Sequence, residues 1–356
     1  MQFSGTAREI RALRHSKPSH AGNRSMNWSV VSTVAEPAQL VCAFVAHHLH
    51  LGAARVHLFL DRPDERTQRL LSGVEGVALT VCDEAYWRER GGWPGLVTER
   101  QKINAQSVYD SGETEWLLHV DADEFLDHSA GLTEAMQHAD PSCAELRVEV
   151  RERVRISGDR RSDIFAGCFR IPAERSASFY RSIYGEEAAG FLHKGLKAYS
   201  HFKTLYRRGR GLALGIHAAR NGREANSHPA SVPGRPLLHF DGLTPLSWVQ
   251  KMYQKLLIED YRNKPNPARR AQLIRFERHA REPHAISAIF QALDTLDEAQ
   301  KQALEREGLL DCTPFSPRPA LEAIFPGMHF DFSQSAFDAS IDMAPEIRAL
   351  KVDRTA

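Results

Sequence analysis

Residues 115–126 of the chain read EWLLHVDADEFL, a short apolar run followed at once by three carboxylates in four positions. The apolar run, residues 116–120, has the length and composition of a buried strand. Side chains alternate between the two faces of an extended chain, so Asp121 and Asp123 are expected to point the same way. Two such charges repel each other unless a cation lies between them, and Mg²⁺ or Mn²⁺ held by carboxylates keeps open positions for phosphate oxygens. The segment therefore predicts a divalent metal site and chemistry on a phosphorylated substrate.

The alternative interpretation of an Asp-x-Asp pair after a strand is a solvated turn with a helix cap. The residues around the pair favour the metal site. An apolar strand feeds the carboxylates, and Phe125 and Leu126 follow them. Carboxylates in such apolar surroundings are costly to bury unless they are compensated.

Before this segment, apolar runs with strand and helix periodicity alternate along the chain. Strand–helix–strand units of this length predict an α/β fold, a mostly parallel Rossmann-type sheet with helices on both faces. Ligands of such sheets bind beyond the carboxyl ends of the strands, where Glu36, Asp61 and Asp121 all fall. The expected strands cover residues 28–34, 56–60, 77–81 and 116–120, and the expected helices cover 38–51, 67–71 and 96–111.

The chain lacks the glycine-rich loops that bind phosphates in many nucleotide enzymes. No G-x-G-x-x-G follows the first strand, no G-x-x-x-x-G-K-[ST] occurs, and Val34-Ala35-Glu36-Pro37 occupies the first turn. Phosphates must then be met by a metal and by basic side chains. Arg100, on one helical face with Gln101 and Asn104, could contribute, and a solvated helix face is the alternative.

The composition sets broad limits on the class of protein. A chain of 356 residues can hold one large α/β domain with extensions or two smaller domains. Its hydrophobic content of 42%, charged content of 26% and net charge of +1 are typical of a soluble protein that does not bind nucleic acid. Five scattered cysteines without a C-x-x-C pair favour a reduced, cytoplasmic protein without disulfide bonds or structural zinc. No apolar run has the length that crosses a bilayer, and peripheral membrane contact stays open.

The first twenty-five residues differ from the rest of the chain. They hold five basic residues against the single acid Glu9, and they have no apolar segment of the kind that a secretory signal carries. We expect residues 1–25 to be a disordered basic extension and Met26 to be the true or an alternative start. A basic arm that touches acidic lipid or nucleic acid is the alternative.

Residues 26–129 resemble the nucleotide-sugar-binding half of family 2-like glycosyltransferases with a GT-A fold, in the bacterial branch whose acidic motif reads Asp-x-Asp-Glu-Phe. The family's first turn usually reads Lys-Asn-Glu, of which this chain keeps Glu36. After the second strand the family carries Asp-Asn-x-Ser, of which this chain keeps Asp61. The matching segments are Val31-Ser32-Thr33, Glu36, residues 44–48, Leu51-Gly52, residues 56–61 and residues 116–125.

The resemblance implies roles for the nucleotide-sugar-binding residues. Glu36 and Asp61 would contact the nucleoside, and Asp121 and Asp123 would hold the Mn²⁺ or Mg²⁺ ion that bridges the diphosphate. Arg100 joins the predicted nucleotide-sugar-binding residues from its helical face alone. Such a cation offsets the charge that builds on the nucleoside diphosphate as the glycosidic bond breaks.

Residues 193–242 also resemble this family. After the acidic motif, the family has a Lys-rich strand, then a His, and then a His-Phe or His-Tyr pair before a helix. A late His or Asp completes the metal shell or serves the acceptor in such enzymes. His217 and His239 are candidates for the metal shell. Asp241 is the candidate general base, with His239 beside it as a catalytic candidate. A structural hydrogen-bonding role is the alternative for each histidine, and Lys203 could meet a diphosphate or solvate a sheet edge.

Beyond residue 244 the periodicity predicts helices. The first has an apolar stripe, with Lys251 and Lys255 outside it, that favours core packing over membrane contact. The tail after residue 311 is expected to pack back on the domain or to close over the acceptor site. The expected helices cover residues 245–261, 268–279, 285–293 and 297–307.

Together these observations predict a GT-A domain over residues 26–244, with a nucleotide-sugar half (26–129) and an acceptor half (130–244), and a helical C-terminal extension over 245–356. The expected activity is transfer of a sugar from a nucleotide-sugar donor to a glycan, lipid-linked or protein acceptor, as in polysaccharide biosynthesis. The resemblance implies inversion at the sugar carbon. Two alternatives stay open: another metal-dependent nucleotide enzyme such as a nucleotidyltransferase, and a non-catalytic binding protein with this fold.

Overall fold

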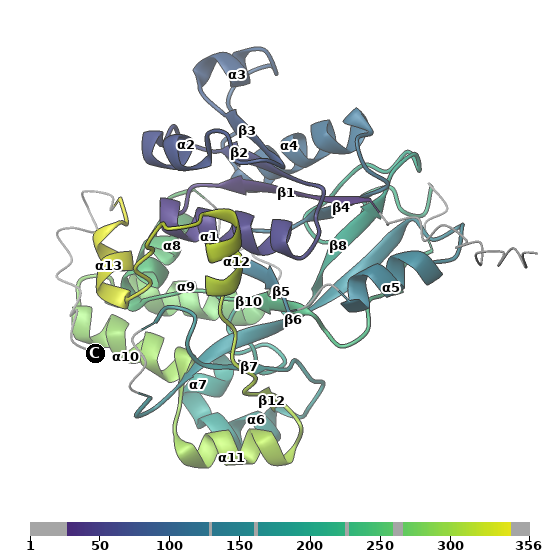
Figure 1. Cartoon of the computed structure of the whole chain (residues 1–356). Coiled ribbons are helices and arrows are strands. Elements are labelled where there is room, and N and C mark those ends of the chain that lie inside the picture. Colours follow the sequence, from purple (N-terminus) through teal and green to yellow (C-terminus); the bar gives the residue numbers. More distant parts are fainter. Residues whose placement is uncertain (1–26, 128–129, 160–162, 225–227, 259–265, 343–356) are drawn as a thin grey trace, which may run out of the picture.

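The computed structural model describes residues 27–127, 130–159, 163–224, 228–258 and 266–342, and it shows a 12-stranded mixed sheet covered by helices (Figure 1). The predicted basic extension, residues 1–25, lies outside the described residues. In the first half, strands and helices alternate where the apolar runs predict them. These elements are β1 (Trp28–Val34), α1 (Ala38–His50), β2 (Arg55–Leu60), α2 (Glu65–Leu71), β3 (Val77–Val81), α3 (Glu84–Arg88), α4 (Val97–Ser111) and β4 (Trp116–His119).

Four parallel strands, in the order β3-β2-β1-β4, form the nucleotide half of the sheet. Val31 of β1 is in register with His57 of β2 and with His119 of β4. The chain steps outward from β1 to β2 and β3 and then returns to the other side of β1 with β4. The strand order therefore reverses between β1 and β4, and the carboxyl ends of all four strands meet at one edge. In open α/β sheets a reversal of this kind marks the ligand site.

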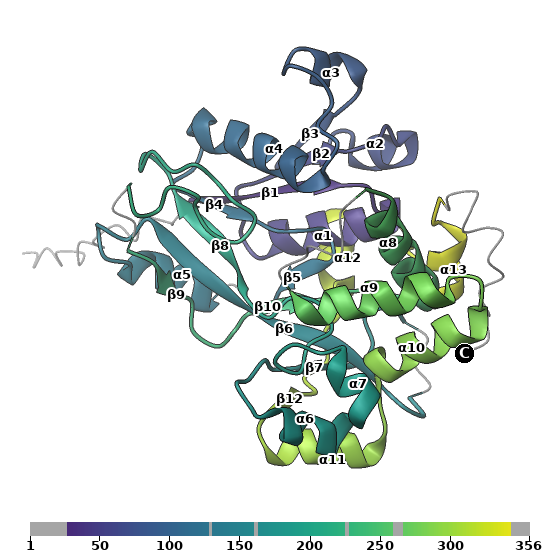
Figure 2. The same ribbon diagram turned by 180° about the vertical axis from the view of Figure 1, so that it is seen from behind.

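Helices α1 and α4 cover opposite faces of these strands (Figures 1 and 2). Val30 shares a buried apolar cluster with Phe44 of α1, whereas Val31 shares another with Val108 of α4. Neighbouring residues of a strand point to opposite faces, so the two helices lie on opposite sides of β1. The predicted fold class, an α/β sheet flanked by helices, is confirmed.

The second half of the sheet is built around the long strand β6. Strand β10 runs parallel to β6 and antiparallel to β5, and it brings His239 opposite Glu124 in the acidic segment. Strands β8, β6, β7 and β12 continue the sheet beyond β4 with antiparallel pairing. The elements of this part are β5 (Glu124–Leu126), α5 (Ala130–His138), β6 (Glu145–Ile156), β7 (Cys168–Arg170), α6 (Ala177–Tyr184), α7 (Glu186–Gly190), β8 (Phe202–Arg207), β9 (Ala230–Ser231), β10 (Leu237–His239) and β12 (Leu310–Asp311).

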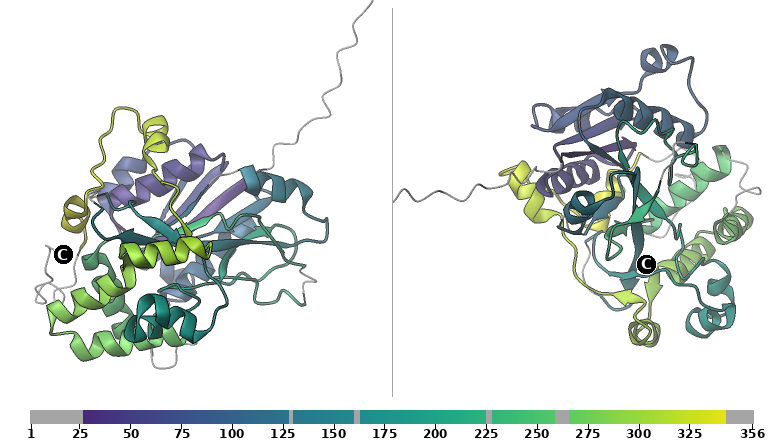
Figure 3. Two further views of the ribbon diagram at one scale, coloured as in Figure 1. Left: turned by 90° about the horizontal axis from the view of Figure 1, so that it is seen from below. Right: turned by 90° about the vertical axis from the view of Figure 1, so that its right-hand side faces the viewer.

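The C-terminal segment is helical, as predicted, and it returns to the nucleotide half. Trp248 and Met252 of α8 form a buried cluster with residues of α9 and α10. Leu321 and Phe325 join the apolar cluster of α1, so the tail packs back on the domain (Figure 3). No described helix is long and apolar enough to cross a membrane. The remaining elements are α8 (Pro245–Ile258), α9 (Pro267–His279), α10 (Pro283–Asp294), β11 (Thr295–Leu296), α11 (Glu298–Arg306), α12 (Arg318–Ile324) and α13 (Gln334–Ala339).

A disulfide bond joins Cys168 of β7 to Cys312, which directly follows β12. The expectation of a chain without disulfide bonds is therefore wrong. The two cysteines are separated by 144 positions, and the antiparallel pairing of β7 with β12 brings their Cα atoms to 4.2 Å. No local spacing reveals such a pair. Cys42, Cys82 and Cys143 are buried free thiols.

We expect Cys168→Ser and Cys312→Ser each to lower the free energy of unfolding by about 2–4 kcal/mol, because the bond closes a long loop and restricts the unfolded chain. Urea unfolding without reductant measures the loss. The double variant is the control. It should lose no more than either single variant, since each substitution removes the same bond. Additive losses, or no loss at all, would contradict the cross-link.

Candidate functional site

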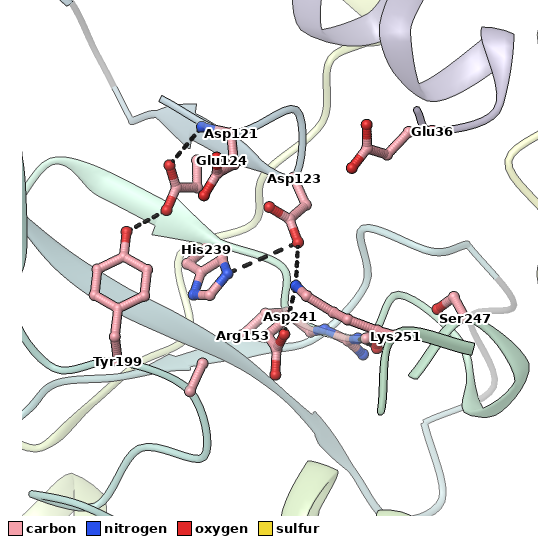
Figure 4. A network of polar contacts seen from close by, with 12 residues as sticks. Glu36, Asp121, Asp123, Glu124, Arg153, Tyr199, His239, Asp241, Ser247 and Lys251 are labelled. Carbon is pink, nitrogen blue, oxygen red and sulfur yellow. Dashed lines mark hydrogen bonds and ion pairs between the residues drawn. The ribbon is translucent and has the colours of Figure 1, made fainter. Parts of the chain in front are cut away.

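The acidic segment turns sharply at the carboxyl end of β4, and its own hydrogen bonds hold the turn (Figure 4). The Glu124 backbone N–H donates to the Asp121 carbonyl at 3.1 Å. The Asp121 backbone N–H in turn donates to the Glu124 carboxylate at 2.8 Å. Glu124 thus shapes the loop that presents Asp121 and Asp123.

Strand β10 brings two further side chains to this loop. The Phe240 backbone N–H donates to the Asp123 carbonyl at 2.9 Å, so the residues on either side of Phe240 flank Asp123. Asp123, His239 and Asp241 each offer one ligand atom, and these three atoms lie within 4.8 Å of one another. His239 Nε2 is 3.8 Å from Asp123 Oδ2. Two carboxylates and an imidazole are a donor set that suits Mn²⁺ and related divalent ions.

Gly242 lets the chain turn from this group directly into α8. Its φ of +68° is unfavourable for other residues, and a Cβ atom there would lie 2.9 Å from Trp248. The close packing of Gly242 on Trp248 sets the start of α8 against the end of β10. Lys251, one turn further along α8, then faces the acidic group.

Two basic side chains neutralise the carboxylates of this group. Lys251 Nζ lies 2.9 Å from Asp123 Oδ2 and 2.6 Å from Asp241 Oδ1. Arg269 Nη2 lies 3.0 Å from Asp241 Oδ2. Burial alone would raise the pKa of both aspartates. The Lys251 ammonium, acting with His239 on Asp123 and with Arg269 on Asp241, outweighs burial and holds both pKa values below the usual range. Lys251 lies outside the apolar stripe of its helix, and this polar face is turned to the site.

Asp121 has its own counter-ion. Lys203 Nζ, almost fully buried, lies 2.7 Å from Asp121 and 3.3 Å from Glu124. Burial opposes ionisation of Asp121, but the Lys203 ammonium prevails and lowers its pKa to about 2. Gln101 also donates to Asp121 at 2.6 Å, and the Tyr199 hydroxyl donates to Glu124. Lys203 is thus an internal partner of the acidic segment.

Glu36, at the end of β1, faces Asp123 across the site (Figure 4). Burial, and then the charge of Asp123, raise its pKa to about 7. If all acids were ionised and His239 neutral, five carboxylates would face three cations, a surplus of two negative charges that a divalent ion would offset. The groups are Glu36, Asp121, Asp123, Glu124, Asp241, Lys203, Lys251 and Arg269. The pKa values of Glu36, Glu124 and His239 are all raised, so protons offset part of this charge when no divalent ion is bound.

Of the predicted metal candidates Asp121, Asp123, His217 and His239, the structure brings two together, Asp123 and His239. Within the described ranges, the close group around Asp123 contains His239 and Asp241, and it leaves out Asp121 and His217. His217 Nδ1 pairs with the Phe202 carbonyl at 2.9 Å, and burial lowers the pKa of His217 to about 4. The pairing of β10 with β5, which the sequence does not reveal, decides which histidine reaches the acidic segment.

Asp61 and Arg100, both predicted to bind the nucleotide-sugar, form an ion pair with each other. Arg100 Nε and Nη2 each lie 2.6 Å from an oxygen of Asp61, and the guanidinium lies 4.7 Å from the centre of the Trp93 ring. The pair stands beside a cleft of about 680 Å³ at the ends of β2 and β3. Its lining residues are Asp61, Arg62, Pro63, Cys82, Asp83, Glu84, Trp87, Arg88, Gly91, Gly92 and Trp93.

No protein-family model matches the chain, and no curated protein matches it. Solved structures do match. The mannosyltransferase PcManGT from Pyrobaculum calidifontis, in complex with GDP-Man and Mn²⁺, is 13% identical, with 83% of this chain and 78% of that chain covered and a TM-score of 0.35. Glucosyl-3-phosphoglycerate synthase from Mycobacterium tuberculosis, with Mg²⁺ and uridine diphosphate, is 12% identical, with 58% and 68% covered and a TM-score of 0.32.

A further match is CMP:2-keto-3-deoxy-manno-octonic acid synthetase complexed with CTP, which is 16% identical, with 51% of this chain and 74% of that chain covered and a TM-score of 0.28. The matches thus include a glycosyltransferase, the class that the sequence resembles. TM-scores this low do not indicate a function for this chain.

We expect Lys203→Met to destabilise the protein by about 2–4 kcal/mol at about pH 7, because Asp121 and Glu124 lose their buried counter-ion. The lowered pKa of Asp121 stabilises the folded protein at pH values above 3.8, the pKa of this group in the unfolded chain. This stabilisation is lost as the pH falls towards about 2, its pKa in the folded protein. The penalty of the substitution should therefore shrink between about pH 7 and about pH 3. Urea unfolding at both pH values measures it. Lys301→Met, at an exposed ion pair, is the control and should change stability by less than about 0.5 kcal/mol.

Proposed function

We propose that the protein is a metal-dependent glycosyltransferase that moves a sugar from a nucleotide-sugar donor to an acceptor hydroxyl. The observation that carries this proposal is the convergence of Asp123, His239 and Asp241 at the edge where the strand order reverses. The surplus of negative charge supports a divalent cation at this point. The carboxyl ends of parallel strands are also where α/β sheets bind nucleotides.

The cleft beside Asp61 and Arg100 would take the nucleoside of the donor. Trp93 is 51% exposed at this cleft and packs against the buried Trp87, so Trp93 offers flat aromatic surface to a base. Stacking of a base on an aromatic side chain is favourable for every base. Arg62 and Arg88 line the same cleft and could meet phosphate oxygens. The predicted contact of Asp61 with the nucleoside remains part of this proposal.

The residues of the acidic group would divide the chemical work. A divalent cation, when bound to Asp123, His239 and Asp241, supplies positive charge for the departing nucleoside diphosphate. A general base works best with a pKa near the operating pH. Asp241, held in two ion pairs with a pKa far below the usual range, therefore suits a ligand role better than its predicted role as base. Glu36, with a pKa of about 7, is the carboxyl group best suited to accept the proton of the acceptor.

The acceptor class, whether glycan, lipid-linked or protein, the inverting outcome and the cytoplasmic location remain predictions from the sequence and its resemblance. Donor binding is the first part of the proposal to test.

A melting screen of UDP-, GDP-, CMP- and dTDP-sugars and of the nucleoside triphosphates, with and without Mn²⁺, tests the donor site. A ligand at a hundred times its dissociation constant stabilises the folded state by about 2.7 kcal/mol, which raises the midpoint by a few degrees. We expect one nucleotide class to give this shift, with Mn²⁺ required, in the parent and not in Asp123→Asn. Asp110→Asn, at an exposed helix position, is the control and should keep the shift. A shift from nucleoside triphosphates alone would favour a nucleotidyltransferase, and no shift from any nucleotide would reject the proposal.

We expect Trp93→Ala to weaken binding of the stabilising nucleotide by about tenfold or more, since a stacked base contributes roughly 1–3 kcal/mol. Titration calorimetry with the free nucleoside diphosphate measures the loss. Trp93→Phe keeps an aromatic face and should retain most of the affinity. Met328→Ala removes a similarly exposed apolar side chain elsewhere and should change nothing. Equal affinity in Trp93→Ala and the parent would place the base outside this cleft.

A further inference from the structure

The ammonium group of Lys251 lies between Asp123 and Asp241, two of the three candidate metal ligands, and contacts both carboxylates. Its ammonium lies 2.9 Å from Asp123 Oδ2 and 2.6 Å from Asp241 Oδ1. The side chains of Asp123 and Asp241 are 12% and 1% exposed, whereas that of Lys251 is 34% exposed. The ammonium therefore reaches in from α8 towards the two aspartates, while the side chain as a whole stays partly open to solvent (Figure 4).

A divalent ion and this ammonium cannot bind the same oxygens together. Mn²⁺ and Mg²⁺ lie roughly 2.0–2.3 Å from their carboxylate ligands, which is close to the place that the ammonium takes. Two cations at that separation would also repel each other strongly in a buried site. Binding of the metal to Asp123 and Asp241 thus requires Lys251 to move.

The other basic residues of the site are placed differently. Arg269 binds Oδ2 of Asp241, the oxygen that Lys251 does not use, and its guanidinium is held against Met252 Sδ at 3.2 Å. Lys203 is almost fully buried against Asp121 and Glu124, outside the metal-ligand group. Lys251 is the one of these three whose side chain is both on the ligand oxygens of Asp123 and partly open to solvent.

We propose that Lys251 is a built-in competitor for the metal, which neutralises Asp123 and Asp241 when no metal is bound and leaves them when a divalent ion enters. This inference rests on the metal site of the proposed function. It assigns to Lys251 control over metal affinity, a role that neither the Asp-x-Asp motif nor the helix periodicity indicates. The protein would bind its metal weakly and reversibly, because each binding event has to break the charge-assisted hydrogen bond of Lys251 to Asp123 and its ion pair with Asp241.

The test is a titration of the full chain with Mn²⁺ alone, after a chelator has removed any bound metal. Binding is measured by calorimetry and by the electron paramagnetic resonance signal of free Mn²⁺. We expect Lys251→Met to bind Mn²⁺ about tenfold to a hundredfold more tightly than the parent, since a hydrogen bond to a charged group contributes one to two factors of ten in an equilibrium constant. Lys251→Arg keeps the charge and should bind within a few-fold of the parent. Lys301→Met, which removes a remote surface charge, should bind like the parent. Asp123→Asn should abolish the tight binding, which assigns it to this site.

Equal or weaker Mn²⁺ binding in folded Lys251→Met would overturn the inference, because a lysine that merely supports the fold would lower metal affinity when removed. Circular dichroism checks the fold of Lys251→Met. If that variant does not fold, Lys251→Gln, which removes the charge and keeps a polar side chain, takes its place. Failure of this test is distinct from failure of the proposed function. A parent that is stabilised by a nucleotide-sugar with Mn²⁺, while Lys251→Met shows no gain in Mn²⁺ affinity, would keep the transferase proposal and reject the role of Lys251.

Discussion

The need to neutralise carboxylates at the edge of a buried sheet governs this site. Asp121, Asp123 and Asp241 lose water when the sheet forms, and the low pKa values of all three come from ammonium and guanidinium groups brought from other parts of the chain. Lys203 arrives on β8 and Lys251 on α8. The fold is therefore coupled to the electrostatics, because the elements that complete the core also carry the counter-ions.

The hydrophobic packing of the C-terminal helices decides where one of these charges lies. Trp248 and its apolar neighbours anchor α8 at the end of β10, and Gly242 permits the close approach. The polar face of the same helix then has a fixed direction, and Lys251 meets Asp123 and Asp241. The C-terminal segment, which follows the predicted GT-A domain in the sequence, thus contributes a side chain to the site. The return of α12 to α1 and the bond between Cys168 and Cys312 tie the rest of this segment to the sheet.

Much of the fold was predictable because its signals are local. The strands and helices of residues 28–119 follow apolar periodicity, and parallel pairing places the acids after β1, β2 and β4 at one edge. Asp123 was identified for the same reason. Which of the two candidate histidines, His217 or His239, lies beside Asp123 was not predictable, since only the pairing of β10 with β5 brings His239 to the acidic segment. The disulfide bond was missed because its two cysteines meet across an antiparallel pair 144 positions apart.

The sequence by itself determined the α/β class, the carboxylates at the strand ends and the absence of a glycine-rich phosphate loop, because each depends on residues close together in the chain. Only the tertiary structure decided which groups surround those carboxylates. Asp241 and Lys251 reach Asp123 through the pairing of β10 with β5 and the docking of α8. These are long-range contacts, whose energy comes from burial and charge compensation after the chain has folded, and no periodicity along the chain records them.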